Sequence, residues 1–534
     1  MCLLPLEPVA SSRSVRAVAP RLCGTAWLAA GQRQSLGIWS AALMVLLAPN
    51  AWSQSVAGGS RSVALQPYAE ITQTFSNNYL QSAVDASADS ITRLTAGLAL
   101  RSQTGLVRGF ADYSLSGLVY ARHIEQNTFQ NALRASAGAD LIEGRAQLEM
   151  TASISQSAIS AFGVQPSADS STRSNSTEVR RLQLSPTFHG PLGADLRYNA
   201  ALGYGLTDSR GTSNGDSNST SASVHVEPTS KGLLSWSLDG SVLRSDHAAG
   251  RSTETNRLFG GVSSRLDDFD LRLTATGGLE LTDLASAARQ RYTTWGVGAV
   301  WAPSPRTNLS AQYDHRFFGS SHNISLEHRT ALVIFRLSSS RSVSTSGNQA
   351  SASGQGTAFD LYFNQFASLE PDRNKRTDLV NAFLRDQNIQ PTASLGFLQS
   401  SASIQNQQQL SAAWRGVRSA AVLLYTQSTS TQIGLSTGLL GDFASSAEVH
   451  LRGLSLDLSH RLTPMSSLNL TLSQRRGSGK LDTQRNAQQQ VGLNYTTRPN
   501  AYGTLSAGLR RALYDNLSGR FNETAVFATY GMRF

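Results

Sequence analysis

The chain has 534 residues, of which only 15% are charged, and a formal net charge of +10. Both cysteines, Cys2 and Cys23, lie near its beginning, which excludes disulfides, thiol catalysis and cysteine-ligated metals from the remainder. No basic cluster is interleaved with aromatic residues, which argues against nucleic acid as a partner. The excess of arginine suits anionic partners such as lipopolysaccharide phosphates or an acidic polysaccharide, and a GC-rich genome would produce the same bias.

Residues 1–53 have the features of a secretory signal peptide. Several arginines precede the apolar run Leu36–Ala48, which is shorter than a membrane-spanning helix requires. The small residues Ala51 and Ser53 follow it. We therefore expect cleavage after Ser53 and export of the rest of the chain.

Residues 54–337 alternate apolar and polar side chains with a period of two, which predicts strands with one apolar face. The clearest segment is Leu196–Leu206. In a second segment, Trp295 and Trp301 lie at opposite ends of one apolar face, as the aromatic girdles of a membrane barrel require. Low charge and abundant Ser, Gly and Thr suit strands with an outer apolar face and a polar lumen.

The connections between these segments alternate in length. Longer polar joints such as 207–220 and 245–256 alternate with short ones such as 227–232 and 267–269. Outer-membrane barrels have this alternation because their external loops are long and their periplasmic turns are short. The sequence therefore predicts an all-β fold, a transmembrane antiparallel outer-membrane β-barrel.

The alternation stops between residues 338 and 392. A Ser/Gly/Gln-rich linker is followed by two predicted helices, Phe359–Phe366 and a second from Pro371 to about Asn388. The second helix carries an apolar face that needs a partner, consisting of Leu379, Val380, Phe383 and Leu384. Counting the joints, with about fourteen strands before the insert and eight after it, places the insert on the periplasmic side. There it either hangs below the barrel or folds up as a partial plug.

Strands resume in residues 393–534 and bring the expected total to about 22, within a range of 20–24. The last segment ends on alternating apolar residues, among them Tyr530, Met532 and Phe534. A strand at the very end of a chain is expected when it must pair with the first strand to close a barrel. The terminal Phe also resembles the signal read by the barrel assembly machinery, and both termini are expected in the periplasm.

Four segments resemble a known family. They are AFDLYFNQFASLEPDRNKRTDLVNAFL (358–384), IQPTASLGFLQSSASIQNQQQLSAAWRG (389–416), LQPYAEITQTFSNNYLQS (65–82) and DYSLSGLVYAR (112–122). They are similar to the outer-membrane proteins, described as putative β-barrel porins, that accompany PEP-CTERM/exosortase systems and are encoded with exopolysaccharide genes. The resemblance implies an outer-membrane barrel associated with exopolysaccharide production or export in a Gram-negative bacterium. It supplies no catalytic or binding residues.

No residues form a catalytic or cofactor-binding pattern. His315, His322 and His328 are predicted to cluster around a loop, where solvation explains them better than a metal, and the paired acids Asp267 and Asp268 suit a tight turn. Strand parity places six arginines on the lumen side, Arg108, Arg145, Arg197, Arg272, Arg336 and Arg510. They either bind an anionic glycan or, as the more ordinary alternative, pair with acids such as Glu149, Asp239 and Asp457 to stiffen the wall.

Three functions are compatible with these features. The first is an exopolysaccharide-linked channel or secretion accessory that works with periplasmic polysaccharide-export proteins. The second is a general diffusion porin, for which the two-helix insert has no obvious use. The third is a barrel enzyme acting on envelope lipid or glycan, which would need a nucleophile and base that we do not find, so we expect no enzymatic activity and no cofactor.

Overall fold

A computed structural model describes residues 63–534, except 105, 166–174, 214, 231, 249, 346–357, 367–372, 387–395, 400, 435–440 and 482. The predicted signal peptide therefore lies outside the described residues. Within them, 22 strands form one sheet in which every strand is antiparallel to its neighbours. The predicted fold class and the predicted strand number are both confirmed.

The first fifteen strands precede the insert. They are β1 (Val63–Ser76), β2 (Asp89–Gln103), β3 (Val107–Tyr120), β4 (Thr128–Ile142), β5 (Ala146–Ala158), β6 (Ser176–Leu192), β7 (Leu196–Ser209), β8 (Ser217–Pro228), β9 (Leu234–His247), β10 (Thr253–Leu266), β11 (Leu271–Thr282), β12 (Gln290–Ser304), β13 (Thr307–Arg316), β14 (Gly319–Arg329) and β15 (Val333–Ser344). Short 3₁₀ helices follow β3 (η2, Ile124–Gln126) and β10 (η3, Asp267–Phe269). The predicted turn at Asp267 and Asp268 is this second helix, which ends on Asp270 in the left-handed conformation.

The insert contains helices α3 (Ala358–Gln365) and α4 (Arg373–Asp386). The strands after it are β16 (Ser403–Arg415), β17 (Ser419–Gln432), β18 (Glu448–Thr463), β19 (Ser466–Ser478), β20 (Arg485–Thr497), β21 (Gly503–Asn516) and β22 (Gly519–Arg533), with a short helix α5 (Asp442–Ser445) before β18. None of the helices in the described ranges is long and apolar enough to cross a bilayer.

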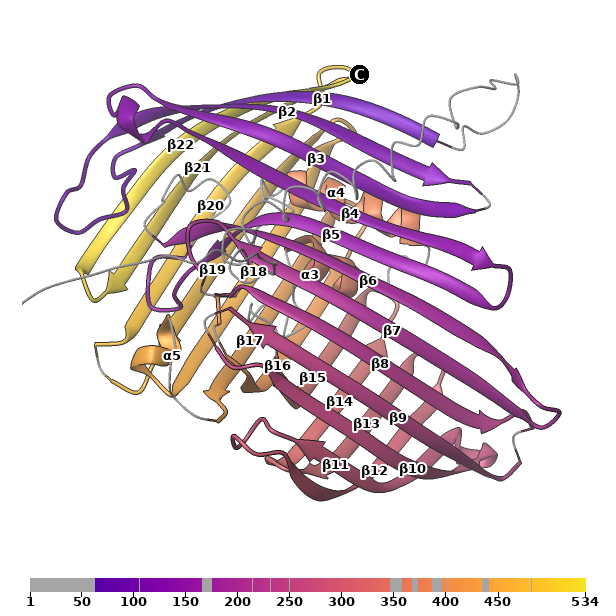
Figure 1. Ribbon diagram of the computed structural model, residues 1–534. Helices are drawn as coiled ribbons and strands as arrows, with labels where there is room; N and C mark the ends of the chain where they lie inside the picture. Colours follow the sequence, from indigo (N-terminus) through magenta and orange to yellow (C-terminus); the bar gives the residue numbers. More distant parts are fainter. Residues whose placement is uncertain are drawn as a thin grey trace, which may run out of the picture. The chain divides into compact units, whose positions relative to one another are not determined.

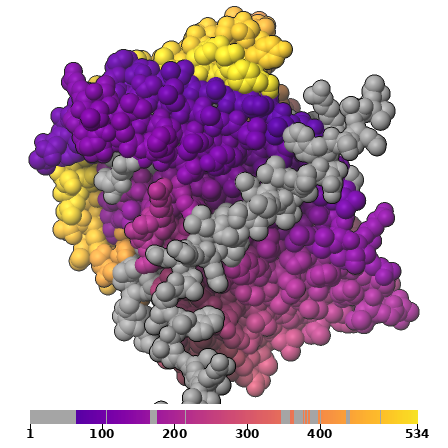
Figure 2. Space-filling view, turned by 45° about the horizontal axis from the view of Figure 1, so that its top comes forward, coloured from indigo at the N-terminus to yellow at the C-terminus, as the bar shows by residue number. Residues whose placement is uncertain are grey.

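The sheet closes between its first and last strands. Residues Tyr68–Ser76 of β1 pair in register with Ala525–Arg533 of β22, and the backbone N–H of Phe534 donates to the carbonyl of Pro67 at 3.0 Å. In the space-filling view the yellow C-terminal surface directly adjoins the indigo N-terminal strands (Figure 2). Closure leaves no edge strand with unpaired backbone groups, which is the condition for a sheet to span a membrane.

Side chains alternate between the two faces of the barrel wall as the membrane requires. Large apolar residues point outward and are exposed, as Leu98 on β2, Leu115 on β3 and Val297 on β12 illustrate. Polar residues point inward and are buried, as Gln405 on β16 and Asn469 on β19 illustrate. An apolar outside and a polar inside belong to a barrel surrounded by lipid. The protein is therefore an outer-membrane β-barrel, and the predicted location in the Gram-negative outer membrane is confirmed.

Connection length identifies the two ends of the barrel. The connections that follow even-numbered strands, such as 143–145 and 464–465, contain two to five residues. Those that follow odd-numbered strands include the long segments 77–88, 159–175 and 345–402. The end with short turns is the periplasmic one, and it also carries the beginning of β1 and the end of β22.

The insert is not on the periplasmic side, and that prediction is wrong. Fifteen strands precede it rather than fourteen, and an odd count places it at the end with long loops, which is extracellular. Its boundaries also differ from the predicted 338–392. Ser338–Ser344 belong to β15 and pair with Ser403–Gln409 of β16, although the sequence suggested a linker. Serine and glutamine predominate here and pair through their backbones, and with Val343 and Ile404 as the only apolar residues of the two segments the period of two is not visible in the sequence.

The orientation of the barrel in the membrane can be checked by labelling single cysteines in intact cells with a membrane-impermeant maleimide. Leu517→Cys, in the exposed turn between β21 and β22, should react. Thr229→Cys, in the exposed turn between β8 and β9, should react only after the outer membrane is permeabilised. The reverse pattern would show that the two ends have been assigned the wrong way round.

The C-terminal Phe534 is expected to act during assembly rather than in the finished barrel. Its side chain is 66% exposed, and the closing seam is made by backbone hydrogen bonds that do not depend on it. Phe534→Ser should therefore lower the amount of heat-modifiable barrel in the outer membrane while leaving the melting temperature of the folded fraction unchanged. The control is Leu517→Ser, which removes an equally exposed apolar residue from the opposite end of β22's hairpin. Equal yields for both variants would remove the assembly role of Phe534.

Candidate functional site

The insert lies inside the barrel and reaches across the lumen. Figure 1 shows α3 and α4 between the purple strands of the near wall and the orange strands of the far wall. The helices pack on inward-facing Ala413, Val422 and Leu424 of β16 and β17. They also contact β3 and β4, through residues described below. The alternative in which the insert forms a partial plug therefore agrees with its position.

The predicted apolar face of α4 is the face that docks. Val380 and Leu384 are fully buried, and Leu379 and Phe383 pack against the same cluster. Phe383 also contacts α3, because the centroids of its ring and of the Tyr362 ring are 4.8 Å apart. Burial of each such side chain contributes roughly 1.5–3 kcal/mol. Because this face is covered by α3 and the wall, it is not presented to a periplasmic export protein.

One polar contact fixes α3 to the far wall. The hydroxyl of Tyr362 donates to Asp457 Oδ2 of β18 at 2.9 Å, and both side chains are buried. Burial and the adjacent carboxylate raise the pKa of the Tyr362 hydroxyl well above its usual range. The phenol therefore remains a donor at every physiological pH, and the hydrogen bond to a charged acceptor is of the stronger kind.

A second contact fixes the insert to the near wall. The guanidinium of Arg134 on β4 lies 3.4 Å from the ring centroid of Phe359 and 5.0 Å from that of Phe110 on β3. Its Nη2 donates to Asn381 Oδ1 of α4 at 3.2 Å. A cation over aromatic rings contributes about 0.5–2 kcal/mol, depending on how dry the contact is. Arg134 therefore contacts both helices and holds them against β4.

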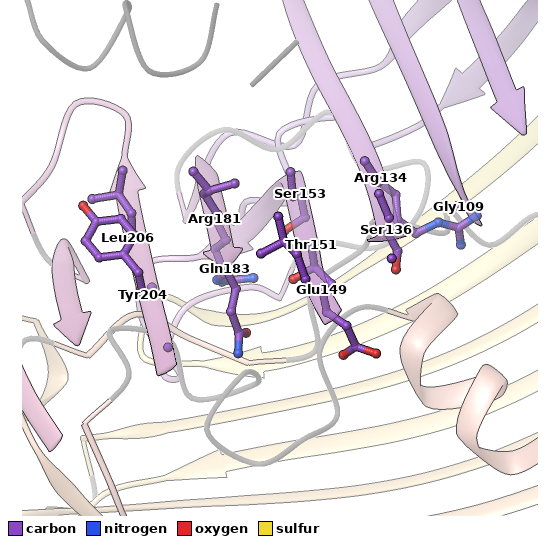
Figure 3. A pocket seen from close by; sticks show the side chains of 18 of the residues that line it. Gly109, Arg134, Ser136, Glu149, Thr151, Ser153, Arg181, Gln183, Tyr204 and Leu206 are labelled. Atoms are coloured by element: carbon purple, nitrogen blue, oxygen red, sulfur yellow. The ribbon is translucent and has the colours of Figure 1, made fainter. Parts of the chain in front are cut away.

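The insert does not fill the lumen. A cavity of about 1050 Å³ remains between it and the inner face of β3–β9. On the wall side its lining mixes hydroxyl, amide and charged groups with apolar residues, and on the other side it is lined by Phe359, Asp360, Phe363 and Thr377 of the insert. Figure 3 shows part of the wall, with Glu149 and Gln183 extending into the same space. This cavity, together with the insert, is the candidate functional site.

A loop crosses the extracellular mouth above the insert. Residues 159–165, which follow β5, reach strands on the far side of the barrel, where Asn486 Nδ2 of β20 donates to the carbonyl of Gly163 at 2.6 Å. Val164 packs against Ala512 and Tyr514 of β21. Ser160 Oγ and the backbone N–H of Ala161 donate to Asp442 of α5 at 2.5 and 2.6 Å. The lumen is thus obstructed twice, at the mouth and deeper inside.

The six predicted lumen arginines do not form one site. Arg108, Arg197, Arg336 and Arg510 face the lumen, and each pairs with an acid of the wall, namely Asp140, Glu227, Glu327 and Glu523. Arg272 also faces inward, opposite Arg265. Arg145 does not belong to the wall, because β5 begins at Ala146 and Arg145 lies in the exposed turn before it.

The acids expected to pair with these arginines have other partners or positions. Asp239 contacts His225 at 2.6 Å, Asp457 accepts from Tyr362, and Glu149 lines the cavity. Four of the arginines therefore do form ion pairs within the wall, as the second alternative expected, but their partners are not the acids that the sequence suggested. Strand parity identifies a face, whereas register decides which neighbours meet.

The three histidines do not cluster around a loop, as the sequence suggested. His315 lies on β13, His322 and His328 lie on β14, and register with outward-facing Tyr313 and Phe335 places all three outside the lumen. Within the described ranges no group of three His, Cys, Asp or Glu side chains could hold a metal ion.

Arg134, Arg181 and Asp360 are site residues that the sequence did not reveal. The strand of Arg134 was hard to recognise, because β4 alternates mainly alanine with small polar residues and its two faces differ little in hydrophobicity. The parity rule that identified Arg108 would have identified Arg134 once β4 had been assigned. Asp360 could not have been found this way, because only the fold brings the insert to that wall.

The loop across the mouth should respond to pH through Asp442. Burial raises the pKa of this carboxyl above its usual value near 4, and the hydrogen bonds from Ser160 and Ala161 offset only part of that effect. The docked loop therefore binds a proton more readily than the undocked loop, and docking should tighten as the pH falls through the raised pKa toward about 4. A thiol reagent should accordingly modify Val164→Cys, which is buried when docked, more slowly at acidic than at neutral pH.

In the Asp442→Asn background the titrating group is absent, and the rate of thiol modification, corrected for the reagent's own pH dependence, should no longer vary with pH. A pH dependence that survives this substitution would mean that another group controls the loop.

No family model matches the chain, and no curated protein does. Among solved structures it is similar to the FrpB iron transporter of Neisseria meningitidis (F3-3 variant), with 10% identity, coverage of 88% of this chain and 81% of that one, and a TM-score of 0.44. A ferric enterobactin receptor, PfeA of Pseudomonas aeruginosa, gives 11% identity, 90% and 81% coverage, and a TM-score of 0.42. The outer membrane protein OpdK of the same organism gives 10% identity, 88% and 99% coverage, and a TM-score of 0.31. These similarities are too remote to carry functional information.

Proposed function

We propose that this protein is a gated outer-membrane conduit that serves exopolysaccharide production or export in a PEP-CTERM/exosortase-type system. The observation that carries the proposal is the α3–α4 insert, which spans the lumen and has identifiable polar contacts with two opposite walls. A plain diffusion porin gains nothing from such an element. The resemblance of the insert segments to the exopolysaccharide-linked family supplies the class of cargo.

The chemistry of the lumen supports a carbohydrate cargo. Buried amides and hydroxyls occur on the inner face of the wall, among them Gln405, Gln407, Ser430, Asn486 and Gln488. Such side chains both donate and accept hydrogen bonds, as sugar hydroxyls require. The proposal assigns transport rather than catalysis to the protein, and any periplasmic export partner would meet the barrel at its short-turn end.

The insert can act as a gate because two polar contacts hold it to opposite walls of the barrel. Tyr362 binds the far wall and Arg134 the near wall, so loss of either contact frees one side. The apolar contact with β16 and β17 does not depend on either polar contact. A movable element of this kind requires two states separated by only a few kcal/mol, which is the size of these contacts.

Planar-bilayer recordings test this function directly. Replacing residues 358–386 by a short Gly–Ser linker should leave a folded barrel, because the strands on both sides pair with each other. The deletion should raise the conductance several-fold, and exopolysaccharide release by the cells should change with it. Unchanged conductance together with unchanged release would return the protein to the diffusion-porin interpretation.

A point variant tests the gate without removing it. Tyr362→Phe deletes the hydrogen bond to Asp457, worth about 1.5–3 kcal/mol for a charged acceptor, and should raise the frequency of open events by about tenfold or more. Tyr425→Phe is the matched control, because the hydroxyl of Tyr425 on β17 binds Gln427 on the outward face. Similar effects of the two substitutions would exclude Tyr362 as an anchor.

A further inference from the structure

Two arginines of the near wall lie at the same level of the barrel. In the register of the sheet, Arg134 of β4 is opposite Ser153 of β5, which is opposite Arg181 of β6. All three side chains have lumen-facing parity and line the cavity. Figure 3 shows them in sequence across the wall, with Gln183 and Thr151 on the neighbouring level.

Each of the two guanidinium groups has buried N–H donors without a hydrogen-bond acceptor. Arg134 is only 8% exposed, and apart from its bond to Asn381 its buried Nε and Nη1 have no hydrogen-bond partner within the described part of the chain. The same is true of the buried Nε and Nη2 of Arg181. Buried donors without acceptors are costly, so an acceptor that enters this part of the cavity gains more there than in water.

The insert places a carboxylate beside this pair. Asp360 of α3 lines the same cavity and interacts electrostatically with both Arg134 and Arg181. Its neighbour Phe359 is the residue that stacks on Arg134. On its wall side the cavity has three arginines (108, 134 and 181) and two acids (140 and 149), so Asp360 brings the lining to neutrality. Asp112 of β3 is opposite Arg134 in the register and is a second acid near that arginine, whereas the charged neighbour of Arg181 is Asp360.

The surroundings of the pair suit a sugar rather than a simple anion. Ser136, Thr151, Ser153 and Gln183 offer hydroxyl and amide groups along the wall. The volume of about 1050 Å³ is at the upper end of ordinary ligand pockets and exceeds what one sugar ring requires.

We propose that Arg134 and Arg181 form a binding site for the carboxylate of an acidic sugar within a glycan chain, and that Asp360 lies beside this site and opposes a second carboxylate while the insert is docked. The inference rests on the proposed function, since it takes the cargo to be a glycan, and it names that cargo as a polyuronate. Two carboxylates cannot share the pair without repulsion. Binding of the uronate and docking of α3 are therefore antagonistic, and an arriving acidic polymer loosens the gate that blocks it.

Calorimetric titration of the purified full-length protein with hexagalacturonate tests this site, with maltohexaose as the neutral probe of equal length. Wild type should bind hexagalacturonate and not maltohexaose. Arg134→Gln and Arg181→Gln should each weaken binding by about tenfold, whereas Asp360→Asn should strengthen it by a similar factor, within the usual range of coupling between sites. Heat-modifiability on gels confirms that each variant is folded.

The control for charge alone is Glu227→Gln, which removes one lumen acid from the Arg197 pair at the periplasmic end of β8. It should change the affinity by less than about twofold. Equal strengthening by Glu227→Gln and Asp360→Asn would overturn the proposal, as would equal binding of maltohexaose or unaltered affinity in Arg181→Gln. These titrations do not depend on conductance, so failure of the gate and failure of the binding site give different results.

Discussion

Every other feature of this protein depends on the backbone hydrogen bonds between β1 and β22. In lipid an unpaired N–H or C=O costs several kcal/mol, so a sheet can span the membrane only if its two edges pair with each other. Closure of the sheet creates an enclosed lumen, and with it an inner face that is shielded from lipid. The polar side chains of the wall, which would be unacceptable on the outer surface, become an interior that can hold both water and protein.

A wide lumen needs something to close it, and the chain supplies this from one end. Both obstructing segments, the loop 159–165 and the insert with α3 and α4, follow odd-numbered strands and therefore start from the extracellular end. The loop is tied to α5 and to β20 and β21, and the insert to β4 and β18. Each segment contacts strands that are far from its own hairpin in the sheet. Its position therefore depends on these tertiary contacts and not on the hairpin from which it extends.

The contacts of the insert divide into two kinds with different consequences. Its apolar face, centred on Val380 and Leu384, rests on small and branched residues of β16 and β17 and supplies most of the attachment. Its polar interactions, the hydrogen bond of Tyr362 with Asp457 and the electrostatic interaction of Asp360 with the arginine pair, depend on charge and geometry and can be exchanged for interactions with a ligand. An element attached in this way can be displaced by chemistry specific to the cargo without unfolding the barrel, whose own stability lies in its hydrogen-bonded wall.

The sequence alone determined the class of fold, because period-two alternation, short and long joints and an apolar final strand all follow from the demands of lipid on a closed sheet. It also determined which face of α4 needs a partner, through the spacing of Leu379, Val380, Phe383 and Leu384. It did not determine the end of the barrel from which the insert starts. One strand more or less before the insert reverses that end, and Ser338–Ser344, with Val343 as its single apolar residue, shows no period of two. Only the tertiary structure decided that Asp360 meets Arg134 and Arg181, since residues separated by more than 170 positions are brought together by register around the wall and by docking of the insert.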